Sequence, residues 1–408
     1  MLDAEEVRSE FPAFERLVHG RPLVYLDTAS TAQKPRAVLA AMAHAYEATA
    51  NIHRGVHLLS VEATQAFEAA RTSAARLLGS GARSEEIVFV RGTTEGMNLL
   101  AQTHGRQRVG AGDEVLVTAL EHHSNLVPWQ LLCQERGARL RVLPIDGRGE
   151  IQLDSLSDVL TERTRIVAIS QASNSLGTMV PVAAIAARAR AVGATVIVDG
   201  AQGIVHGPVD VAALGCDFYV FSGHKLYGPT GTGVVWGRYA LLDAMPPWQS
   251  GGDMVEEVSL ERATFREPPH RFEAGTPNIV GVIGLGAAID WFSRIGPARA
   301  AAHDASLVAY ASEVLAKVPD LRLVGAPRER IGVFSFVLGD HHAHDVGTAV
   351  DVEGVAIRTG HHCTQPVMEH FGVAATARAS FGVYTTRGDI DQLAAALLRA
   401  RALLGGAS

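Results

Sequence analysis

The stretch Asp217–Gly233, DFYVFSGHKLYGPTGTG, indicates both the fold class and the chemistry of this chain. Its first six residues, Asp217–Ser222, form a largely apolar run that predicts a strand, and a glycine-rich turn follows. Lys225 lies at the start of that turn, directly after the strand. A lysine in such a place can be desolvated and lose its proton, as Schiff-base chemistry requires. An ordinary surface lysine is the weaker interpretation, because the approach is apolar and the residues of the turn are small.

Six further segments have the features of strands in the same sheet. Most are continuous apolar runs, as expected of a mainly parallel sheet that helices cover on both faces. Helical patterns alternate with them, which is typical of an α/β fold. The predicted strands are Ile87–Val90, Glu114–Thr118, Arg139–Leu143, Arg165–Ser170, Thr195–Asp199 and Gly233–Gly237, and the predicted helices are Glu95–Thr103, Leu126–Arg136 and Val182–Val192.

A second, smaller α+β unit follows an alanine-rich helical stretch that begins near Gly281–Gly296. In it, Gly332–Leu338 and Gly354–Arg358 are predicted strands, and Ala343–Val352 and Ile390–Leu404 are predicted helices. A chain of 408 residues is too long for one ordinary core. We therefore expect a large domain over residues 21–285 and a small C-terminal domain over residues 286–408.

The composition narrows the function classes. The chain has 36 Lys and Arg against 43 Asp and Glu, a net charge of −7, which argues against a general nucleic-acid surface. The N-terminus has acidic residues and no long apolar run, so we expect neither a signal peptide nor a membrane helix. Cys133, Cys216 and Cys363 are widely spaced and form no CxxC pair, so a reducing, cytoplasmic compartment fits best.

Polar residues follow three more of the predicted strands, and ligands of open α/β sheets collect at the carboxyl ends of strands. Thr93 and Thr94 lie where a strand passes into a helix, so the helix N-terminus could hold a phosphate. An ordinary threonine cap is the simpler interpretation of these two residues. His122 follows a second strand and could stack on a planar ring, or could be a capping or solvated histidine.

Asp199 ends the strand Thr195–Asp199, where a partly desolvated carboxylate needs a partner. It could hold a ring nitrogen in its protonated form, and Gln202 could reach a phenolic oxygen nearby. A lysine, a carboxylate and an anion cradle at neighbouring strand ends are what pyridoxal 5'-phosphate (PLP) requires. The order of these motifs along the chain is more specific than any one of them.

The third cysteine lies in Arg358–Pro366, RTGHHCTQP. A glycine, a proline and potential cations surround Cys363, and such neighbours favour a reachable thiolate. A loop cysteine that merely follows two histidines is the other interpretation at this point.

Together, these motifs resemble the cysteine desulfurase branch of the class V aminotransferases, and more narrowly its SufS type, which includes selenocysteine lyases. The resemblance covers nearly the whole chain. It implies the fold-type I arrangement, with a large seven-stranded, mostly parallel domain and a small domain built from both chain ends, which residues 1–20 would join. The motifs are YLDTASTAQKP (Tyr25–Pro35), NIHRGVHLLS (Asn51–Ser60), VRGTTEGMN (Val90–Asn98), EHHSNLVPWQ (Glu121–Gln130), VDGAQ (Val198–Gln202), FSGHKLYGPTG (Phe221–Gly231), FEAGTPN (Phe272–Asn278), RTGHHCTQP and ARASFGVYTT (Ala377–Thr386).

The resemblance implies PLP as the cofactor and a role for each residue of the site. Lys225 would be the Schiff-base lysine, Asp199 would pair with the pyridine nitrogen, and Gln202 would bond the phenolic oxygen. His122 would stack on the ring, and Cys363 would be the persulfide-forming nucleophile. The other implied roles are phosphate binding by Thr94, Ser222 and His224 with Thr93 close by, contact of Thr276 with the phosphate of the neighbouring subunit in a homodimer, and substrate binding by Asn174, Arg378 and Arg358 with His53 nearby.

The implied reaction converts L-cysteine to L-alanine and passes the sulfur to an acceptor protein for iron–sulfur cluster assembly. His122 and His361 are the candidates for generating the Cys363 thiolate. A selenocysteine lyase or a cysteine-sulfinate desulfinase would use the same cofactor site. An aminotransferase or racemase would need Lys225 but not Cys363, and a scaffold without activity is disfavoured by the presence of Lys225, Asp199 and Cys363 together.

Four residues depart from the family pattern. Ser30 replaces a small apolar residue, Gln171 a histidine, Ser175 a valine and Thr364 an alanine. We expect these departures to tune the activity rather than abolish it.

Three histidines lie in HHAHD, His341–Asp345, between a predicted strand and a predicted helix. A solvated turn is one interpretation of this segment. The other is that His344 offers a ligand to zinc on the sulfur acceptor, since a neutral imidazole binds zinc well. Acceptors of such enzymes are either metal-free (SufE-like) or zinc-containing (SufU-like), and we expect no metal site within the chain itself.

Overall fold

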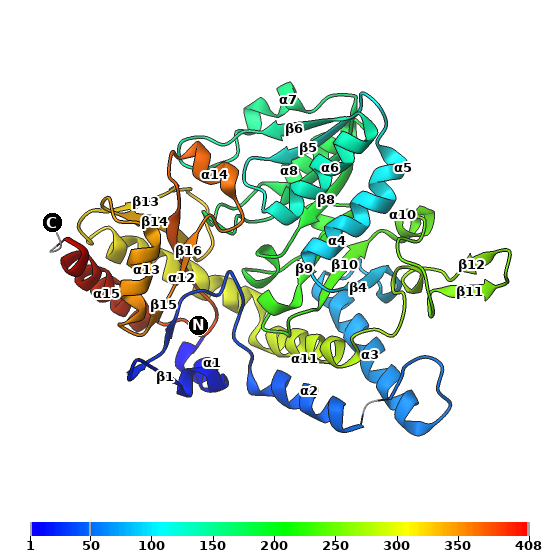
Figure 1. Cartoon of the computed structure of the whole chain (residues 1–408), viewed down its shortest axis with the longest axis horizontal. Helices are drawn as coiled ribbons and strands as arrows, with labels where there is room; N and C mark the ends of the chain where they lie inside the picture. The colour runs from blue at the N-terminus through cyan, green and yellow to red at the C-terminus, as the bar shows by residue number, and fades with distance from the viewer. Residues whose placement is uncertain (1, 49, 406–408) are drawn as a thin grey trace.

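The structure is a computed structural model that describes residues 2–48 and 50–405. A central sheet lies between helices, and a smaller group of strands and helices adjoins one end of it (Figure 1). Both chain termini lie in this smaller group (Figure 1).

In the described residues the central sheet has seven strands, in the order β4-β10-β9-β8-β7-β5-β6. β10 runs antiparallel to β4 and β9, and all other neighbours are parallel, which confirms the predicted mostly parallel sheet. Each predicted strand of this sheet is present, with bounds that differ by at most one residue. The strands are β4 (Ile87–Val90), β5 (Glu114–Thr118), β6 (Arg139–Leu143), β7 (Thr164–Ser170), β8 (Thr195–Asp199), β9 (Phe218–Ser222) and β10 (Gly233–Gly237).

Both faces of the sheet are buried, which explains the continuous apolar runs in the sequence. Successive side chains of a strand point to opposite faces. On β9, Phe221 packs into the core that α3, α8 and α11 close, and Val220 packs into the core that α4 and α6 close.

The three helices predicted around the central sheet are present in the structure. α4 begins at Thr93, two residues earlier than predicted, because Gly92 takes the N-cap position with φ 155°. A π-helical turn over Ala101–Gly105 follows it. The helices are α2 (Arg36–Ala48), α3 (Leu58–Leu77), α4 (Thr93–Leu100), α5 (Arg106–Arg108), α6 (Val127–Arg136), α7 (Leu156–Val159), α8 (Val182–Ala191), α9 (Val211–Leu214), α10 (Tyr239–Ala244) and α11 (Ile279–Ile295).

The smaller group contains a four-stranded sheet in the order β13-β14-β17-β16. Its core is shared with α12, α13 and α15. The N-terminal chain joins it, because β3 pairs in parallel with β15. The bounds are α1 (Ala4–Ser9), β1 (Leu17–Val18), β2 (Arg21–Pro22), β3 (Val24–Tyr25), α12 (Pro297–Leu315), β13 (Leu321–Leu323), β14 (Val333–Leu338), α13 (Ala343–Asp351), β15 (Val355–Ala356), β16 (Arg358–Gly360), α14 (Gln365–His370), β17 (Thr376–Ser380) and α15 (Arg387–Gly405).

The prediction of one strand over Gly354–Arg358 is wrong. The chain changes partners there: β15 pairs with β3, and β16 then pairs with β17. As a result Arg358 lies directly opposite Arg378 in the antiparallel register of β16 and β17.

α11 is a long apolar helix that runs across residue 285, the predicted boundary between the two domains. The domain division therefore stays a prediction. No single helix among residues 2–48 and 50–405 is long and apolar enough to cross a membrane. α11 and α12 satisfy the length and composition criteria only as a pair, and that pair is bent by 71°.

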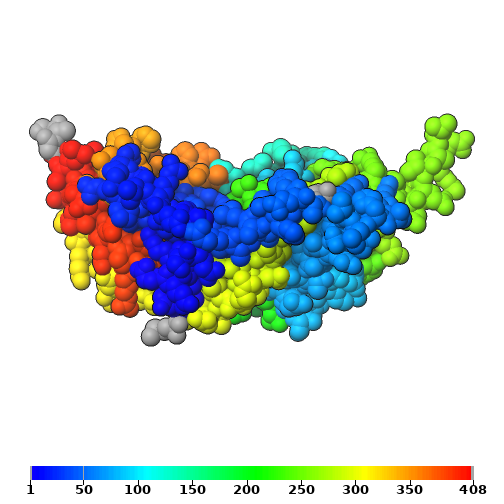
Figure 2. Space-filling model, turned by 90° about the horizontal axis from the view of Figure 1, so that it is seen from below, coloured from blue at the N-terminus to red at the C-terminus, as the bar shows by residue number. Residues whose placement is uncertain are grey.

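A hairpin that we did not predict projects from the body of the molecule. It consists of β11 (Val255–Val258) and β12 (Ala263–Phe265), and both views show it standing clear of the rest (Figures 1 and 2). Val258, Leu260 and Phe265 are exposed apolar residues on it. Exposed apolar groups that gather in one place are typical of a surface that another chain covers.

A buried ion pair ties the segment before Thr276 to the sheet. Arg71 on α3 donates from Nη1 and Nη2 to the two carboxylate oxygens of Glu273, at 2.7 and 2.9 Å. Arg71 also donates to the carbonyl of Ile87 on β4, and the N–H of Phe89 donates to Glu273. α3, β4 and the chain leading to Thr276 are thus held at one point.

Arg71→Leu is expected to destabilise the protein by about 3–5 kcal/mol, because Glu273 would remain as a buried carboxylate without its cation. Urea unfolding followed by circular dichroism would measure the change. Arg106→Leu is the matched control: Arg106 pairs with Glu135 at the surface, and loss of such a pair costs about 0–1 kcal/mol. Equal losses in the two variants would contradict the structural role of the Arg71–Glu273 pair.

Candidate active site

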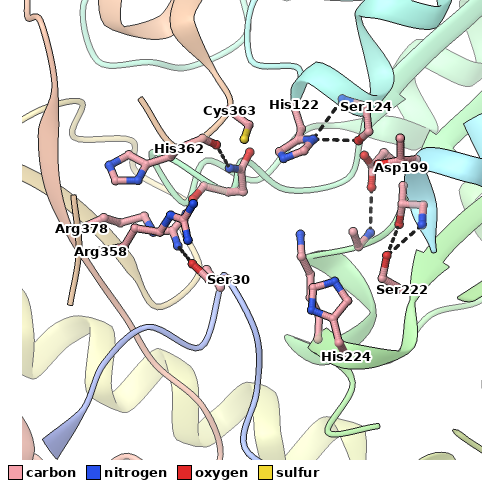
Figure 3. Close-up of a pocket in the computed structure, with 16 residues that line it drawn as sticks. Ser30, His122, Ser124, Asp199, Ser222, His224, Arg358, His362, Cys363 and Arg378 are labelled. Atoms are coloured by element: carbon pink, nitrogen blue, oxygen red, sulfur yellow. Dashed lines mark hydrogen bonds between the residues drawn. The ribbon is translucent and has the colours of Figure 1, made fainter. Parts of the chain in front are cut away.

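A pocket of about 250 Å³ lies where the carboxyl ends of β8 and β9 and the start of α4 face the smaller group (Figure 3). It contains most of the residues that the sequence singled out. The predicted residues that line it are Thr93, Thr94, His122, Asn174, Asp199, Ser222, His224, Lys225, Arg358, Cys363 and Arg378.

The first turn of α4 forms one wall of the pocket and is suited to an anion. It has no side-chain cap, and its N-cap residue is Gly92. The Thr93 N–H donates to Ser222 Oγ at 2.8 Å, and the Thr93 and Ser222 hydroxyls also lie 2.8 Å apart. His224 lines the same wall, and burial, followed by Lys225 and Lys34, lowers its pKa to about 4. A helix N-terminus with two hydroxyls and a neutral imidazole fits a phosphate group.

Lys225 and Asp199 form the floor of the pocket at adjacent strand ends. Burial lowers the pKa of the Lys225 ammonium, an effect that Asp199 opposes and Arg378 reinforces. Burial raises the pKa of Asp199, an effect that Lys225 and the N–H of Ala201 oppose. Asp199 Oδ1 accepts from that N–H at 2.9 Å, which orients the carboxyl group. The floor therefore offers an amine that loses its proton easily and a carboxyl group held in one orientation.

His122 is neutral, and its tautomer follows from its hydrogen bonds. Nδ1 accepts from the Ser124 N–H at 3.1 Å and lies 2.7 Å from Ser124 Oγ, so the ring proton is on Nε2. Burial, followed by the positive charges of Lys225, His123, Arg378 and Arg358, lowers the pKa of His122 to about 3. A flat, neutral ring with a donor at Nε2 thus faces the pocket (Figure 3).

The loop that carries Cys363 holds an unusual backbone conformation. His362 and Cys363 have φ values of 54° and 57°, in the left-handed region that residues other than glycine rarely adopt. Three contacts hold the loop: His123 N–H to the Cys363 carbonyl at 2.9 Å, Asn174 Nδ2 to the His362 carbonyl at 2.7 Å, and His362 Nε2 to Thr376 Oγ1 at 2.8 Å. The Cys363 sulfur is consequently presented at the pocket (Figure 3).

Two guanidinium groups form the wall opposite α4. Arg378 is buried on β17, and Nη1 donates to the Asn174 carbonyl at 2.9 Å. Arg358 lies opposite Arg378 across the strand pair and is more exposed. This concentration of positive charge is suited to a carboxylate ligand.

Five of the predicted residues do not line the pocket, and one of them, His361, is exposed on the loop that carries Cys363. Gln202 is buried beside it and donates to the carbonyl of Ala29, which does line it. His53 is 2.9 Å from Glu68 and packs against His270. Thr276 faces a separate hollow with Arg91 and Trp248, and His344 is exposed on the first turn of α13.

Sequence reasoning missed three residues that shape the site: Ser124, His362 and Asp27. Ser124 could have been found from its position two residues after His122, which suits a side-chain contact with the start of a helical turn. His362 could have been found as the neighbour of Cys363. Asp27 carried no such signal, because its contact is with Arg378, 351 residues away in sequence.

Two of the residues that we predicted to depart from the family pattern, Gln171 and Thr364, form side-chain hydrogen bonds. Gln171 Oε1 accepts from the buried Tyr219 hydroxyl at 2.6 Å, behind Asp199. Thr364 is buried, and its hydroxyl donates to the His361 carbonyl at 3.0 Å. The Thr364 hydroxyl therefore reinforces the turn that presents Cys363.

Comparison with known proteins agrees with this geometry. Residues 24–393 match the family model described as aminotransferase class V. A cysteine desulfurase of Klebsiella pneumoniae (strain 342) is 53% identical over 406 residues, which are 99% of this chain and 100% of the relative. This chain belongs to the cysteine desulfurases of the class V aminotransferase family. The predicted resemblance is confirmed.

Solved structures of this family show the same fold. The cysteine desulfurase CsdA from Escherichia coli superposes with a TM-score of 0.91 at 41% identity, covering 99% of each chain. The apo structure of a cysteine desulfurase from Thermococcus onnurineus NA1 has a TM-score of 0.93 at 36% identity and covers 100% of this chain and 99% of the other. The predicted fold class is confirmed.

The environments of the three cysteines lead to a simple prediction. Burial raises the pKa of Cys133 to about 11 and that of Cys216 to about 12, whereas Cys363 is exposed. Brief treatment of the native protein with iodoacetamide at neutral pH is expected to alkylate Cys363 and leave the other two intact. Peptide mass spectrometry would measure the sites, with the urea-unfolded protein as the control in which all three react. Rapid native labelling of Cys133 or Cys216 would contradict the prediction.

Proposed function

We propose that this protein is a PLP-dependent cysteine desulfurase that converts L-cysteine to L-alanine and holds the sulfur as a persulfide on Cys363. The sulfur then passes to an acceptor protein for iron–sulfur cluster assembly. The observation that carries this proposal is that Lys225 and Cys363, the exposed one of the three cysteines, line the same pocket. A pocket with Lys225 and no reachable thiol would suit an aminotransferase or racemase equally well.

The residues of the pocket fit PLP. The uncapped first turn of α4, with Thr93, Thr94, Ser222 and His224, suits the phosphate. Asp199 is assigned to the pyridine nitrogen, Lys225 to the aldehyde, Gln202 to the phenolic oxygen and His122 to the face of the ring. When bound, PLP supplies an aldehyde that joins amines and a ring that withdraws electrons from the carbon next to the substrate amine.

The chain's own groups bind the substrate and move its proton. Arg378, Arg358 and Asn174 are assigned to the carboxylate of L-cysteine, and His53 stays a predicted neighbour of the substrate. Because burial lowers the pKa of Lys225, part of its amine is neutral and can take the proton from the substrate α-carbon. His122 has its proton on Nε2, so we assign it as a hydrogen-bond donor to the substrate and leave His361 as the candidate base for Cys363.

Cys363 then takes the sulfur. Its thiolate forms a sulfur–sulfur bond with the sulfur of the substrate while the carbon–sulfur bond breaks. The substrate β-carbon keeps the electron pair of the broken bond and takes up one proton to become the methyl group of alanine. The thiolate must be reachable for this attack, which the exposed position of the Cys363 loop allows.

Two variants test the reaction together. The wild-type protein is expected to form alanine and, with a thiol reductant, sulfide from L-cysteine. Cys363→Ser is expected to keep the absorbance of the bound cofactor and lose desulfuration by several orders of magnitude, because the sulfur has no acceptor. Lys225→Ala is expected to lose both the absorbance and the activity. Absorbance spectra with alanine and sulfide assays would measure these changes.

Each contrary result has a separate meaning. Full desulfuration of L-cysteine by Cys363→Ser would overturn the persulfide role. Activity of that variant on selenocysteine or cysteine sulfinate alone would favour the lyase or desulfinase alternative. An unchanged spectrum and turnover of Lys225→Ala would contradict the assignment of Lys225 to the aldehyde of PLP.

We also propose that the protein works as a homodimer in the cytoplasm. Large exposed apolar side chains gather at the end of α2 and the start of α3: Tyr46 is 73% exposed, Val56 99% and Leu58 69%. α2 and α3 occupy one broad face of the molecule (Figure 2). Thr276 lies outside the pocket of its own chain, which is consistent with its predicted contact with the phosphate of the neighbouring subunit.

The acceptor is proposed to approach the turn that carries His344. His344 is exposed, and its N–H donates to the ring of His342, the N-cap residue of α13, at 3.3 Å. The described residues contain no group of three or more possible metal ligands, so a zinc ion at His344 would have to come with the acceptor. We propose a zinc-containing acceptor rather than a metal-free one, because only a zinc-containing acceptor could use the His344 imidazole as a metal ligand.

His344→Ala is expected to lower acceptor-stimulated turnover by about tenfold or more, as weakening of a metal shell typically does, while turnover with a small thiol stays unchanged. The matched control is His342→Asn, which removes an imidazole from the same turn but keeps an N-cap side chain. Both turnovers would be measured as alanine formed per minute. Equal loss with the protein acceptor and the small thiol, or equal loss in the two variants, would contradict the assignment.

A further inference from the structure

We infer that Ser30 is a positioning residue that holds Arg378 for the carboxylate of the substrate and so favours amino acids over simple amines. The inference rests on the proposed function. Ser30 and Arg378 line the same pocket, and their side chains meet at its rim (Figure 3). Ser30 is a residue at which this chain departs from the family pattern.

The Arg378 guanidinium is held by three acceptors from two separate segments. Nη1 donates to the Asn174 carbonyl at 2.9 Å. Nη2 donates to Asp27 Oδ1 at 3.1 Å and to Ser30 Oγ at 2.7 Å. Nε is buried and has no partner among the described residues. The contact with Ser30 is the shortest of the three.

The Ser30 hydroxyl forms a relay between the carboxylate and the guanidinium. Its O–H donates to Asp27 Oδ1 at 2.6 Å, which leaves an oxygen lone pair to accept from Arg378 Nη2. Hydrogen bonds in such a chain polarise and strengthen one another. Asp27 and Ser30 therefore act on Nη2 as a unit, and an alanine at position 30 would leave Nη2 with the longer bond to Asp27 alone.

The turn that presents Ser30 is anchored to the strand that carries Arg378. The Ser30 N–H donates to the Asp27 carbonyl at 3.1 Å, and the Ala29 N–H donates to Ser380 Oγ on β17 at 2.9 Å. Asp27 also forms a parallel bridge with Ser380. The hydroxyl and the guanidinium thus sit on backbone segments that are fixed to each other, which positioning requires.

The expected effect concerns affinity rather than the chemical step. Without the hydroxyl the guanidinium keeps its charge but loses part of its fixed orientation, so a carboxylate must order it on binding. Water can replace part of the lost bond, because Ser30 is only half-buried. A ligand with no carboxylate does not use Arg378 and is expected to be insensitive to the change.

The test uses the holoenzyme and two ligands that differ only in the carboxylate, S-methyl-L-cysteine and 2-(methylthio)ethylamine. Dissociation constants would be read from the absorbance of the bound cofactor. Ser30→Ala is expected to weaken the binding of S-methyl-L-cysteine by about three- to tenfold and the binding of 2-(methylthio)ethylamine by less than about twofold. KM for L-cysteine is expected to rise by the same factor as the dissociation constant of S-methyl-L-cysteine, with kcat unchanged.

Thr28→Val is the matched control, because it removes a hydroxyl from the same turn. Thr28 Oγ1 is 2.9 Å from the Tyr384 hydroxyl and does not contact Arg378. This variant is expected to bind both ligands as the wild type does. A second check combines Ser30→Ala with Asp27→Asn: if the two residues act as a unit, the double variant binds the amino acid no more weakly than Asp27→Asn alone.

Three results would overturn the inference: unchanged or tighter binding of the amino acid by Ser30→Ala, equal weakening of both ligands, or additive losses in the double variant. Failure of the proposed function is separable from these results. It would appear as absence of alanine and sulfide in the wild type, while the comparison of the two ligands would still report on Ser30.

Discussion

The parallel pairing of β8 with β9 is the constraint on which the site depends. Both strands are buried on both faces, so a charged side chain fits only at their ends. Register then places Asp199, the last residue of β8, beside β9, and Ser222 ends β9 at the same edge of the sheet. Lys225 follows three residues later, in the turn that leaves the sheet. A carboxylate and a lysine meet there because β8 and β9 are neighbours that end at the same edge of the sheet.

Burial at this edge of the sheet also shifts the pKa of titratable groups in the pocket. The same loss of water lowers the pKa of Lys225, lowers that of His122 to about 3 and raises that of Asp199. The positive charges of the pocket act in the same direction on His122, and Asp199 and Lys225 partly offset each other. The neutral state of the imidazole and the lowered pKa of the amine therefore have one physical cause, the desolvation of the pocket.

The opposite wall of the pocket depends on contacts between segments that are distant in sequence. The chain changes partners between β15 and β16, which aligns Arg358 with Arg378, and the N-terminal turn with Asp27 and Ser30 packs beside β17. The Cys363 loop is bound in turn to His123 and Asn174, in the segments that follow β5 and β7. Cys363 and Arg378 are thus positioned by contacts between the two parts of the molecule. The left-handed backbone at His362 and Cys363 is the local strain that this joint maintains.

The sequence by itself determined the sheet, because two-sided burial demands apolar runs that can be recognised residue by residue. Six of the seven strands of that sheet follow from this pattern, whereas the edge strand β6 is partly exposed. Asp199, Lys225 and the turn of Thr93 follow from their positions at strand ends. His122 and Cys363 were candidates from their local sequence, and the family motifs then supplied Asn174, Arg358 and Arg378. Only the tertiary structure decided the split of Gly354–Arg358 into two strands, because the two halves find partners at opposite ends of the chain. It alone also decided the tautomer of His122 and the contact of Arg378 with Asp27 and Ser30. Such contacts join residues separated by up to 351 positions, and no local pattern of hydrophobicity or spacing records them.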